Sequence, residues 1–227
     1  TLMADALPRL AVLASGRGSN LQAILDAIAN GTLDAEVAGV FSDKPGCEAL
    51  RRVPDALRWS RDAAAYANRA GFDADLAAAV AAVRPDWIVC AGYLRILGEG
   101  FVARFAGRLL NIHPSLLPKH RGLRTHARAL AAGDAEHGAS VHFVVPELDA
   151  VAVVAQAVVP VLAGDSADDL ARRVLAREHP LLLATLRLAV AGRLAEREGG
   201  AWLDGHPLFK PLRLSSAGDF NEPTRQP

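Results

Sequence analysis

The sequence predicts an α/β fold: a Rossmann-like, mostly parallel sheet with helices on both faces and an antiparallel addition in the C-terminal half. Two observations predict it. In the first half, short apolar runs alternate with amphipathic helical patterns, which is typical of parallel strands joined by helical crossovers. In the second half, the β-branched runs 139–145 and 153–160 follow each other without a helical pattern between them. That arrangement favours antiparallel pairing.

The elements of the first half follow from periodicity and from their end signals. The helix that begins at Ser19 places Leu21, Ile24 and Ile28 on one face and ends near Gly31. The expected strands are 9–14, 37–41, 87–91 and 108–112, and the other expected helices are 73–83 and 100–105.

The second half carries a long helix over 166–188, with Ser166 as its N-cap, and His179-Pro180 is expected to divide it. A shorter helix over 127–132 is expected with Thr125 as N-cap, and 202–205 predicts a hairpin turn. Without repeats or a Gly/Ser linker, we expect one domain over 8–205 and a C-terminal extension over 206–227, flexible from about 215.

Composition excludes several classes of protein. Lys plus Arg is 25 and Asp plus Glu is 25, so the net charge is zero, which argues against nucleic acid as a partner. The longest apolar stretch, 150–163, is interrupted by Gln156 and Pro160 and is too short to span a membrane. Cys47 and Cys90 form no framework for disulfides, and the N-terminus does not read as a signal peptide. We therefore expect a cytoplasmic protein with no membrane partner.

A cluster of histidines occupies the middle of the chain. Five of the seven lie within thirty residues: His113, His120, His126, His137 and His142. Their spacings match no zinc motif, and no nearby cysteines complete a tetrahedral set, so no metal site is expected. For the last three, a structural role is the simpler interpretation.

The loop Ser15-Gly16-Arg17-Gly18-Ser19-Asn20 lies between a predicted strand and a predicted helix. Glycines there allow close approach of a ligand, and the free N–H groups of a helix start favour an anion. Position 21 is Leu rather than the third glycine of a dinucleotide motif, and no Lys completes a Walker motif. The loop suits a single phosphate. The alternative is a tight turn with a serine N-cap and no ligand.

Asn111 and His113 follow an apolar run and are two residues apart, so an extended chain points both side chains to one face. Pro114 keeps His113 extended. An amide and an imidazolium N–H aimed at one point would stabilise an oxyanion, whereas the alternative is a strand-end cap beside a structural histidine. If Asp149 reaches His113, it raises the pKa of that imidazole; otherwise it belongs to a solvated acidic turn.

Six motifs follow one another along the chain. They are Ser-Gly-x-Gly-Ser-Asn-Leu at 15–21, Leu-Arg-Ile-Leu at 94–97, Asn-Ile-His-Pro-Ser-Leu-Leu-Pro at 111–118, Gly-Ala-Ser-Val-His-Phe at 138–143, Glu-Leu-Asp at 147–149 and Ala-Gly-Asp-Ser at 163–166. In this order they resemble the glycinamide ribonucleotide transformylases, a family of folate-dependent formyltransferases of purine biosynthesis, and the resemblance runs from about Arg9 to Leu203. The resemblance implies formyl transfer from 10-formyltetrahydrofolate, as a co-substrate, to glycinamide ribonucleotide, without a metal, by a monomer or homodimer.

The resemblance also implies roles for individual residues. The phosphate and ribose of the nucleotide are assigned to Gly18, Ser19, Asn20 and Glu178. The catalytic residues are Asn111, His113 and Asp149, with Thr125, His126 and Ser140 in support. Folate binding is assigned to Arg69, Leu94, Arg95, Ile96, Leu97, Asn111, Val145, Pro146, Glu147, Leu148 and Asp149.

The sequence departs from the family after Asp149, where Val151 stands in place of a usual glycine. A β-branched residue is strained at positive φ, so we expect weaker folate binding than in a Val151→Gly variant. His120-Arg121 and Arg124 are further departures, close in the chain to the catalytic residues that the resemblance implies.

Four other activities compete with transformylation. Methionyl-tRNA formyltransferase shares the Asn-x-His motif but has a further domain and a basic surface. The others are a formyltetrahydrofolate deformylase, a non-catalytic nucleotide-binding module, and a dehydrogenase in which Asp43 imitates the acid that binds ribose.

Overall fold

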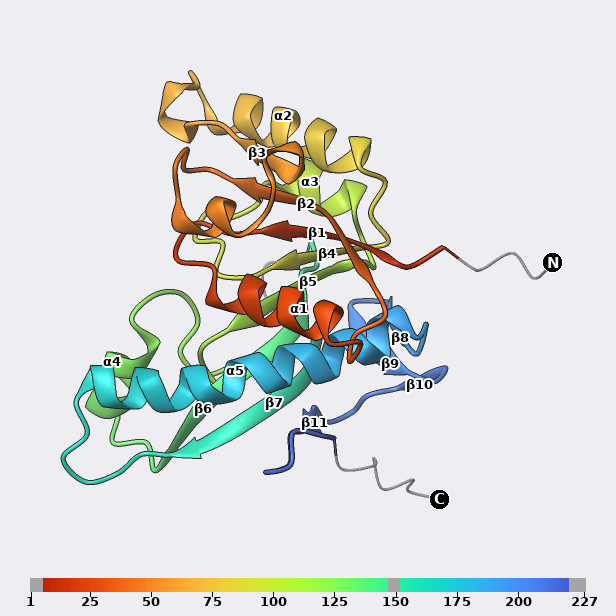
Figure 1. Cartoon of the computed structure of the whole chain (residues 1–227). Coiled ribbons are helices and arrows are strands. Elements are labelled where there is room, and N and C mark those ends of the chain that lie inside the picture. The colour runs from red at the N-terminus through yellow and green to blue at the C-terminus, as the bar shows by residue number, and fades with distance from the viewer. Residues whose placement is uncertain (1–5, 147–151, 221–227) are drawn as a thin grey trace. The chain divides into compact units, whose positions relative to one another are not determined.

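A computed structural model describes residues 6–146 and 152–220 of the chain (Figure 1). The chain divides into two compact units, Thr1–Leu110 and Asn111–Pro227. The boundary falls inside strand β5 (Leu109–His113). No helix in the described ranges is both long and apolar enough to cross a membrane.

The first unit is built on parallel strands in the order β4-β1-β2-β3. Their bounds are β1 (Arg9–Leu13), β2 (Glu36–Ser42), β3 (Arg58–Ser60) and β4 (Trp87–Cys90). The apolar run of β1 lies at the centre, and its residues 10–13 are fully buried. Burial on both faces explains why this strand is continuously apolar rather than alternating. The parallel pairing predicted from the sequence is confirmed.

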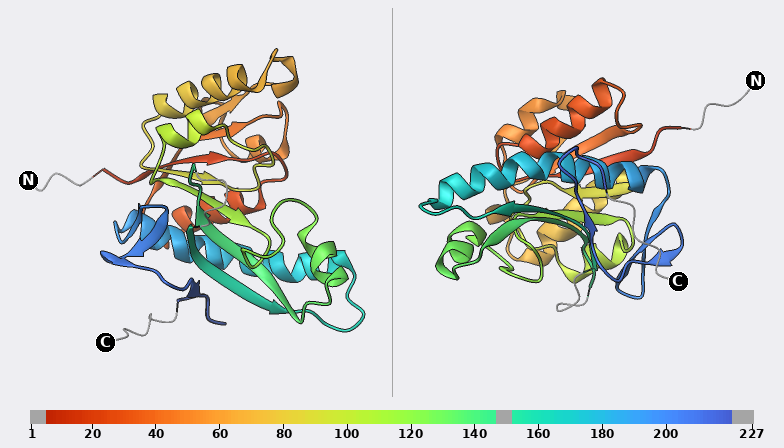
Figure 2. Two further views of the ribbon diagram at one scale, coloured as in Figure 1. Left: turned by 180° about the vertical axis from the view of Figure 1, so that it is seen from behind. Right: turned by 90° about the horizontal axis from the view of Figure 1, so that it is seen from below.

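Helices α1 (Ser19–Ala29) and α2 (Arg69–Ala82) lie on opposite faces of these strands (Figure 2). The connection from β1 to β2 and the connection from β3 to β4 run in opposite directions across the sheet, and right-handed crossovers then place their helices on opposite faces. The short α3 (Glu99–Arg104) packs against α2. Three 3₁₀ turns complete the unit: η1 (Glu48–Arg52), η2 (Asp55–Leu57) and η3 (Ala63–Ala65).

The second unit carries the antiparallel addition. Strands β6 (Glu136–Phe143) and β7 (Ala152–Pro160) pair antiparallel, as predicted, and β11 (Leu212–Arg213) adds to β7 in parallel. Helix α5 (Ala167–Val190) runs along one face of β6 and β7 (Figure 2). The remaining elements are α4 (Thr125–Ala131) and a small antiparallel sheet of β8 (Leu194–Arg197), β9 (Gly200–Leu203) and β10 (His206–Pro207). The mostly parallel α/β fold and the hairpin turn at 202–205 are confirmed.

Some helix ends differ from the prediction. Helix α2 begins at Arg69 instead of 73, because the Asn68 side chain accepts a hydrogen bond from the Gly71 N–H and caps the helix. The N-cap of α4 is Arg124, in the left-handed region at φ 57°, so Thr125 is not the cap. The Ser166 N-cap of α5 is confirmed and forms a capping box with Asp169.

Helix α5 continues through Pro180, so the expected division at His179-Pro180 is wrong. A proline in a helix interior removes one backbone hydrogen bond and usually kinks or breaks the helix. Here Val174, Leu181 and Leu182 on either side are fully buried, so packing holds the helix together. Residues 215–220, at the start of the expected flexible tail, make hydrogen bonds. Ser215 N–H donates to Asp219 O, and Arg177 donates to the Ser215 carbonyl.

Candidate active site

The glycine loop of the first unit is held in a conformation that requires glycine. Gly18 is the N-cap residue of α1, at φ 75°. A Cβ there would lie 2.7 Å from the Cβ of Ala49 in η1. The Ala49 N–H donates to Gly16 O at 3.0 Å, and the Arg52 side chain donates to Arg17 O at 2.8 Å. Contacts with the 3₁₀ turn η1 therefore fix the conformation of the glycine loop.

The start of α1 suits an anion. The helix has no side-chain cap hydrogen bond and no acidic residue in its first turn, so its positive end is not neutralised there. Ser19 is the first residue of the helix. The ligand-free alternative required it to be the N-cap, which it is not. Asn20 follows it and is buried. Gly18, Ser19 and Asn20 thus stand together at one helix start, as the phosphate assignment requires.

The predicted folate segment is an irregular stretch between β4 and α3 with exposed apolar side chains. Leu94 is 62% exposed and Ile96 is 75% exposed, so this segment offers two aliphatic side chains two residues apart to a ligand. The guanidinium of Arg69 donates to the Ile96 carbonyl, and it also lies 3.4 Å from Asp73 Oδ2. The guanidinium of Arg95 lies 5.0 Å from the Phe72 ring centroid. The structure therefore brings Arg69 to the segment with which the resemblance grouped it.

In the second unit, Asn111 and His113 lie on β5 and both are half-buried, as expected for residues two apart on a strand. The Asn111 Nδ2 lies 3.0 Å from His142 Nε2. The other ring nitrogen of His142, Nδ1, lies 2.9 Å from the Phe143 carbonyl. A carbonyl only accepts, so Nδ1 carries the hydrogen of a neutral ring and Nε2 accepts from Asn111. Burial lowers the pKa of His142 to about 4, which keeps the ring neutral.

This contact fixes which way the Asn111 amide faces. One N–H of the amide donates to His142 Nε2, which leaves the second N–H and the carbonyl oxygen for other hydrogen bonds. Sequence reasoning gave His142 only a structural role. The sequence predicts both strands on which residues 111 and 142 lie. It does not predict that these strands place the two side chains in contact, so the role of His142 could not be found from the sequence.

His113 is held by the loop that follows it. Its Nε2 lies 3.1 Å from the His120 carbonyl and therefore carries a hydrogen. Burial lowers the pKa of His113, and the nearby Arg128 charge lowers it further, against the opposing effect of the hydrogen bond to His120 O. The groups described around it thus favour neutral imidazole. Its expected carboxylate partner Asp149, together with Glu147, Leu148 and Val151, lies outside the described residues, whereas Val145 and Pro146 follow the end of β6.

A buried polar network shapes the loop 114–118. Ser140 Oγ donates to Ser115 O at 2.7 Å and accepts from the Leu117 N–H and from Gln156 Nε2, each at 3.0 Å. Gln156 Nε2 also donates to Leu117 O at 2.9 Å. Thr125 Oγ1 donates to Pro114 O at 2.6 Å. Thr125 and Ser140 therefore support the loop after His113, and Gln156, on β7, is a member of the network that the sequence did not indicate.

His126 and His137 contact each other, and His120 contacts a carboxylate. His126 Nδ1 lies 3.1 Å from His137 Nε2, and His120 Nε2 lies 2.6 Å from Asp134 Oδ2. Within residues 6–146 and 152–220, no group of three His, Cys, Asp or Glu side chains is arranged to hold a metal ion. The structural interpretation fits His126 and His137, whereas His142, the third histidine to which it was applied, contacts Asn111.

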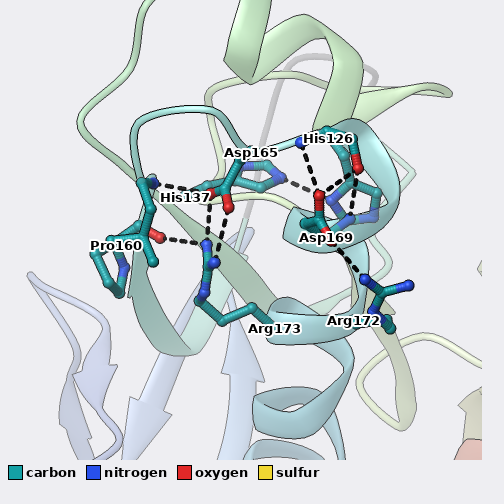
Figure 3. A network of polar contacts seen from close by, with 9 residues as sticks. His126, His137, Pro160, Asp165, Asp169, Arg172 and Arg173 are labelled. Carbon is teal, nitrogen blue, oxygen red and sulfur yellow. Dashed lines mark hydrogen bonds and ion pairs between the residues drawn. The ribbon is translucent and has the colours of Figure 1, made fainter.

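His126 and His137 lie beside the start of α5 (Figure 3). There Arg173 bonds both oxygens of Asp165, at 2.6 and 2.9 Å, and donates to Pro160 O at 2.9 Å. This ion pair lowers the pKa of Asp165 to about 2. The network joins the end of β7 to α5, the helix on which Glu178 lies half-buried.

Asp43 bears on the dehydrogenase alternative. Its carboxylate is only 9% exposed and accepts a hydrogen bond from Ser15 Oγ at 2.6 Å. An acid that binds a ribose must reach the ligand. Asp43 is instead turned into the protein, and this removes the one residue that suggested a dinucleotide.

Comparison with known proteins settles the family. The family model "Formyl transferase" matches residues 8–186. The chain belongs to the formyl transferase family. Among relatives, phosphoribosylglycinamide formyltransferase of Escherichia coli (strain K12) is 47% identical over 201 residues, which cover 88% of this chain and 95% of that protein.

Solved structures of formyl transferases agree. Glycinamide ribonucleotide transformylase 1 from Symbiobacterium toebii superposes with a TM-score of 0.84 at 40% identity, covering 89% of this chain and 97% of that one. A formyltetrahydrofolate deformylase from Pseudomonas syringae pv. tomato gives 0.77 at 26% identity, and only 66% of its chain is covered. The predicted resemblance, the α/β fold and the enzyme class of formyltransferase are confirmed.

Proposed function

We propose that this formyl transferase moves the formyl group of 10-formyltetrahydrofolate to the amine of glycinamide ribonucleotide. The observation that carries the proposal is the Asn111–His113 pair at the end of β5, with the Asn111 amide oriented by His142. An oriented N–H donor beside an imidazole suits a reaction that develops negative charge on a carbonyl oxygen.

The reaction balances without a further reagent. The amine nitrogen attacks the formyl carbon, a carbon–nitrogen bond forms, and the carbonyl oxygen becomes an oxyanion. The bond from that carbon to the folate nitrogen then breaks, and the proton lost by the amine passes to the folate nitrogen. Asn111 donates to the oxyanion, and a protonated His113 adds a second donor. Because the described surroundings lower the pKa of His113, its protonation depends on a carboxylate, the role we propose for Asp149.

The substrate sites follow the same assignment. We propose that Gly18, Ser19 and Asn20 bind the phosphate, that Glu178 binds the ribose, and that Arg69 and the segments 94–97 and 145–149 bind the folate. Residues 8–205 would act as one catalytic domain, and the enzyme would work in the cytoplasm as a monomer or homodimer, without metal or nucleic acid.

One assay tests the activity against its alternatives. Protein mixed with 10-formyltetrahydrofolate and glycinamide ribonucleotide should change the folate absorbance, and the change should need the nucleotide. Loss of the formyl group without nucleotide would identify a deformylase and overturn the proposal. No reaction with either mixture, but binding of the nucleotide, would identify a binding module. Asn111→Ala should lower kcat by about a hundredfold to a thousandfold, as for other donors to an oxyanion.

The glycine loop offers a matched pair of variants for the phosphate site. A Cβ at Gly18 meets Ala49 at 2.7 Å and the residue has φ +75°, whereas a Cβ at Gly16 meets nothing within 4 Å. Gly18→Ala should distort the loop and raise KM for the nucleotide at least about tenfold, the value of one or two hydrogen bonds to a charged group. Gly16→Ala should change it by less than about threefold. Equal KM values for the two variants would contradict a phosphate site here.

A further inference from the structure

The hydroxyl of Ser15 connects the two predicted substrate segments of the first unit. It donates to Asp43 Oδ1 at 2.6 Å and accepts from the Leu94 N–H at 3.0 Å. Ser15 is 4% exposed and Asp43 is 9% exposed, so both groups are removed from water. Ser15 is followed directly by Gly16 of the glycine loop, and Leu94 is the first residue of the folate segment. The Ser15 side chain thus bonds the start of the folate segment, and the Ser15 backbone leads directly into the glycine loop.

The position is set by the sheet. Parallel strands β2, β1 and β4 end at the same edge, and their exits are tied by backbone bonds. Ala14 N–H donates to Phe41 O at 3.0 Å, and Ser15 N–H donates to Gly92 O at 3.1 Å. Asp43, Ser15 and Leu94 follow these three strands, one on each. The two hydrogen bonds of the Ser15 hydroxyl therefore link the segments that follow these three neighbouring strands.

The chemistry makes this a stiff connection. A hydroxyl that donates to a carboxylate forms a short, charge-assisted hydrogen bond, stronger than a neutral one. The same bond fixes the hydroxyl rotor, so that an oxygen lone pair faces the Leu94 N–H. Without Asp43 the rotor is free, and without the Ser15 oxygen the partly buried Leu94 N–H loses its acceptor.

We propose that Ser15 and Asp43 are positioning residues that hold the phosphate loop and the folate segment in the geometry needed to bind both substrates. The proposal rests on the function proposed above, because that function gives the two segments their ligands. Ser15 and Asp43 are buried and act through the backbone of the two segments, so their effect should fall on substrate binding more than on the chemical step.

The experiment compares Ser15→Ala, Asp43→Ala and Asp43→Asn with a matched control, Ser42→Ala. Ser42 is fully buried and lies one residue from Asp43. Its hydroxyl accepts from Lys44 N–H and contacts Cys47 Sγ, and it bonds neither segment. KM for each substrate, kcat and the urea midpoint of unfolding are measured for every variant.

We expect Ser15→Ala and Asp43→Ala to raise KM for both substrates about fivefold to tenfold, the effect of one lost hydrogen bond, with kcat changed less. Asp43→Asn keeps an acceptor oxygen and should recover most of the affinity. Ser42→Ala should lower the urea midpoint while both KM values stay within about twofold of wild type. KM values that stay unchanged in Ser15→Ala and Asp43→Ala, with only a lower midpoint, would overturn the proposal.

A failure of the proposed function is distinguishable from a failure of this inference. If the wild-type chain does not transfer the formyl group, the function fails, and calorimetric binding of tetrahydrofolate and of glycinamide ribonucleotide still compares the variants. If the wild type is active and the variants bind as it does, only the positioning role fails. Should Ser15→Ala not fold, the difference between Asp43→Asn and Asp43→Ala gives the same answer.

Discussion

His142 should contribute to catalysis through Asn111 alone, and His142→Phe tests this. Phenylalanine keeps a ring in the strand but removes the Nε2 acceptor that lies 3.0 Å from Asn111 Nδ2. A hydrogen bond between neutral groups contributes about 0.5–1.5 kcal/mol net, so losing the orientation of the amide should lower kcat roughly twofold to twelvefold. Direct loss of the donor in Asn111→Ala should cost about a hundredfold or more.

The assay is steady-state formyl transfer by four proteins: wild type, the two single variants and the double variant. If His142 acts only by orienting the amide, adding His142→Phe to Asn111→Ala changes kcat no further, because the group it orients is gone. The matched control is His137→Phe, the same exchange on the same strand β6, at a ring that contacts His126 and not Asn111. Its kcat should equal that of wild type.

Two results would refute this reasoning. A loss above about a hundredfold in His142→Phe would place His142 in contact with the substrate. Independent effects that multiply in the double variant would show that His142 acts on something other than Asn111. Because burial lowers the pKa of His142 to about 4, its ring should add no titration to the rate between pH 6 and 8.

The remaining predictions concern stability. Burial lowers the pKa of His137 and His142 to about 4 from 6.5, so the unfolded chain binds more protons between these values; stability should be full above pH 6.5 and fall toward pH 4, by at most about 3 kcal/mol per residue. Urea midpoints against pH check this, and a flat profile over that window would contradict it. A Cβ at Gly138 lies 1.9 Å from Ala157 O, so Gly138→Ala should destabilise the β6–β7 pair by about 1–3 kcal/mol or more. Gly100→Ala, in helix α3 with nothing within 4 Å, should instead stabilise by up to about 1 kcal/mol, and destabilisation there would argue against this packing.

Much of the fold was predictable because local patterns and global structure agree. The apolar run 9–14 is buried on both faces as β1, and the Ser166 capping signal starts α5 where expected. The predicted break at Pro180 is wrong because tertiary packing outweighs a local preference. The late start predicted for α2 arose from a different cause: Asn68 was an N-cap signal that apolar periodicity alone does not weigh.

The candidate site was also predictable only in part from the sequence. Motifs identified the family, the glycine loop and the Asn111–His113 pair. They did not identify Gln156, nor the contacts of His142 with Asn111 and of Asp43 with Ser15, because these contacts join residues 28 or more positions apart in the chain and Gln156 acts through Leu117 and Ser140 on other segments. A hydrogen bond between two strands depends on register, and register is a property of the folded sheet.

The sequence by itself determined the kind of protein this is: an α/β formyl transferase with an anion-binding loop and an Asn-x-His pair after a strand. These features are local, since residue type and spacing set them. Only the tertiary structure decided how the site is held. It turned Asp43 inward to Ser15, oriented the Asn111 amide with a neutral His142, and surrounded His113 with groups that lower its pKa. The physical reason is that burial and long-range hydrogen bonds, which set protonation and orientation, exist only after the strands have paired.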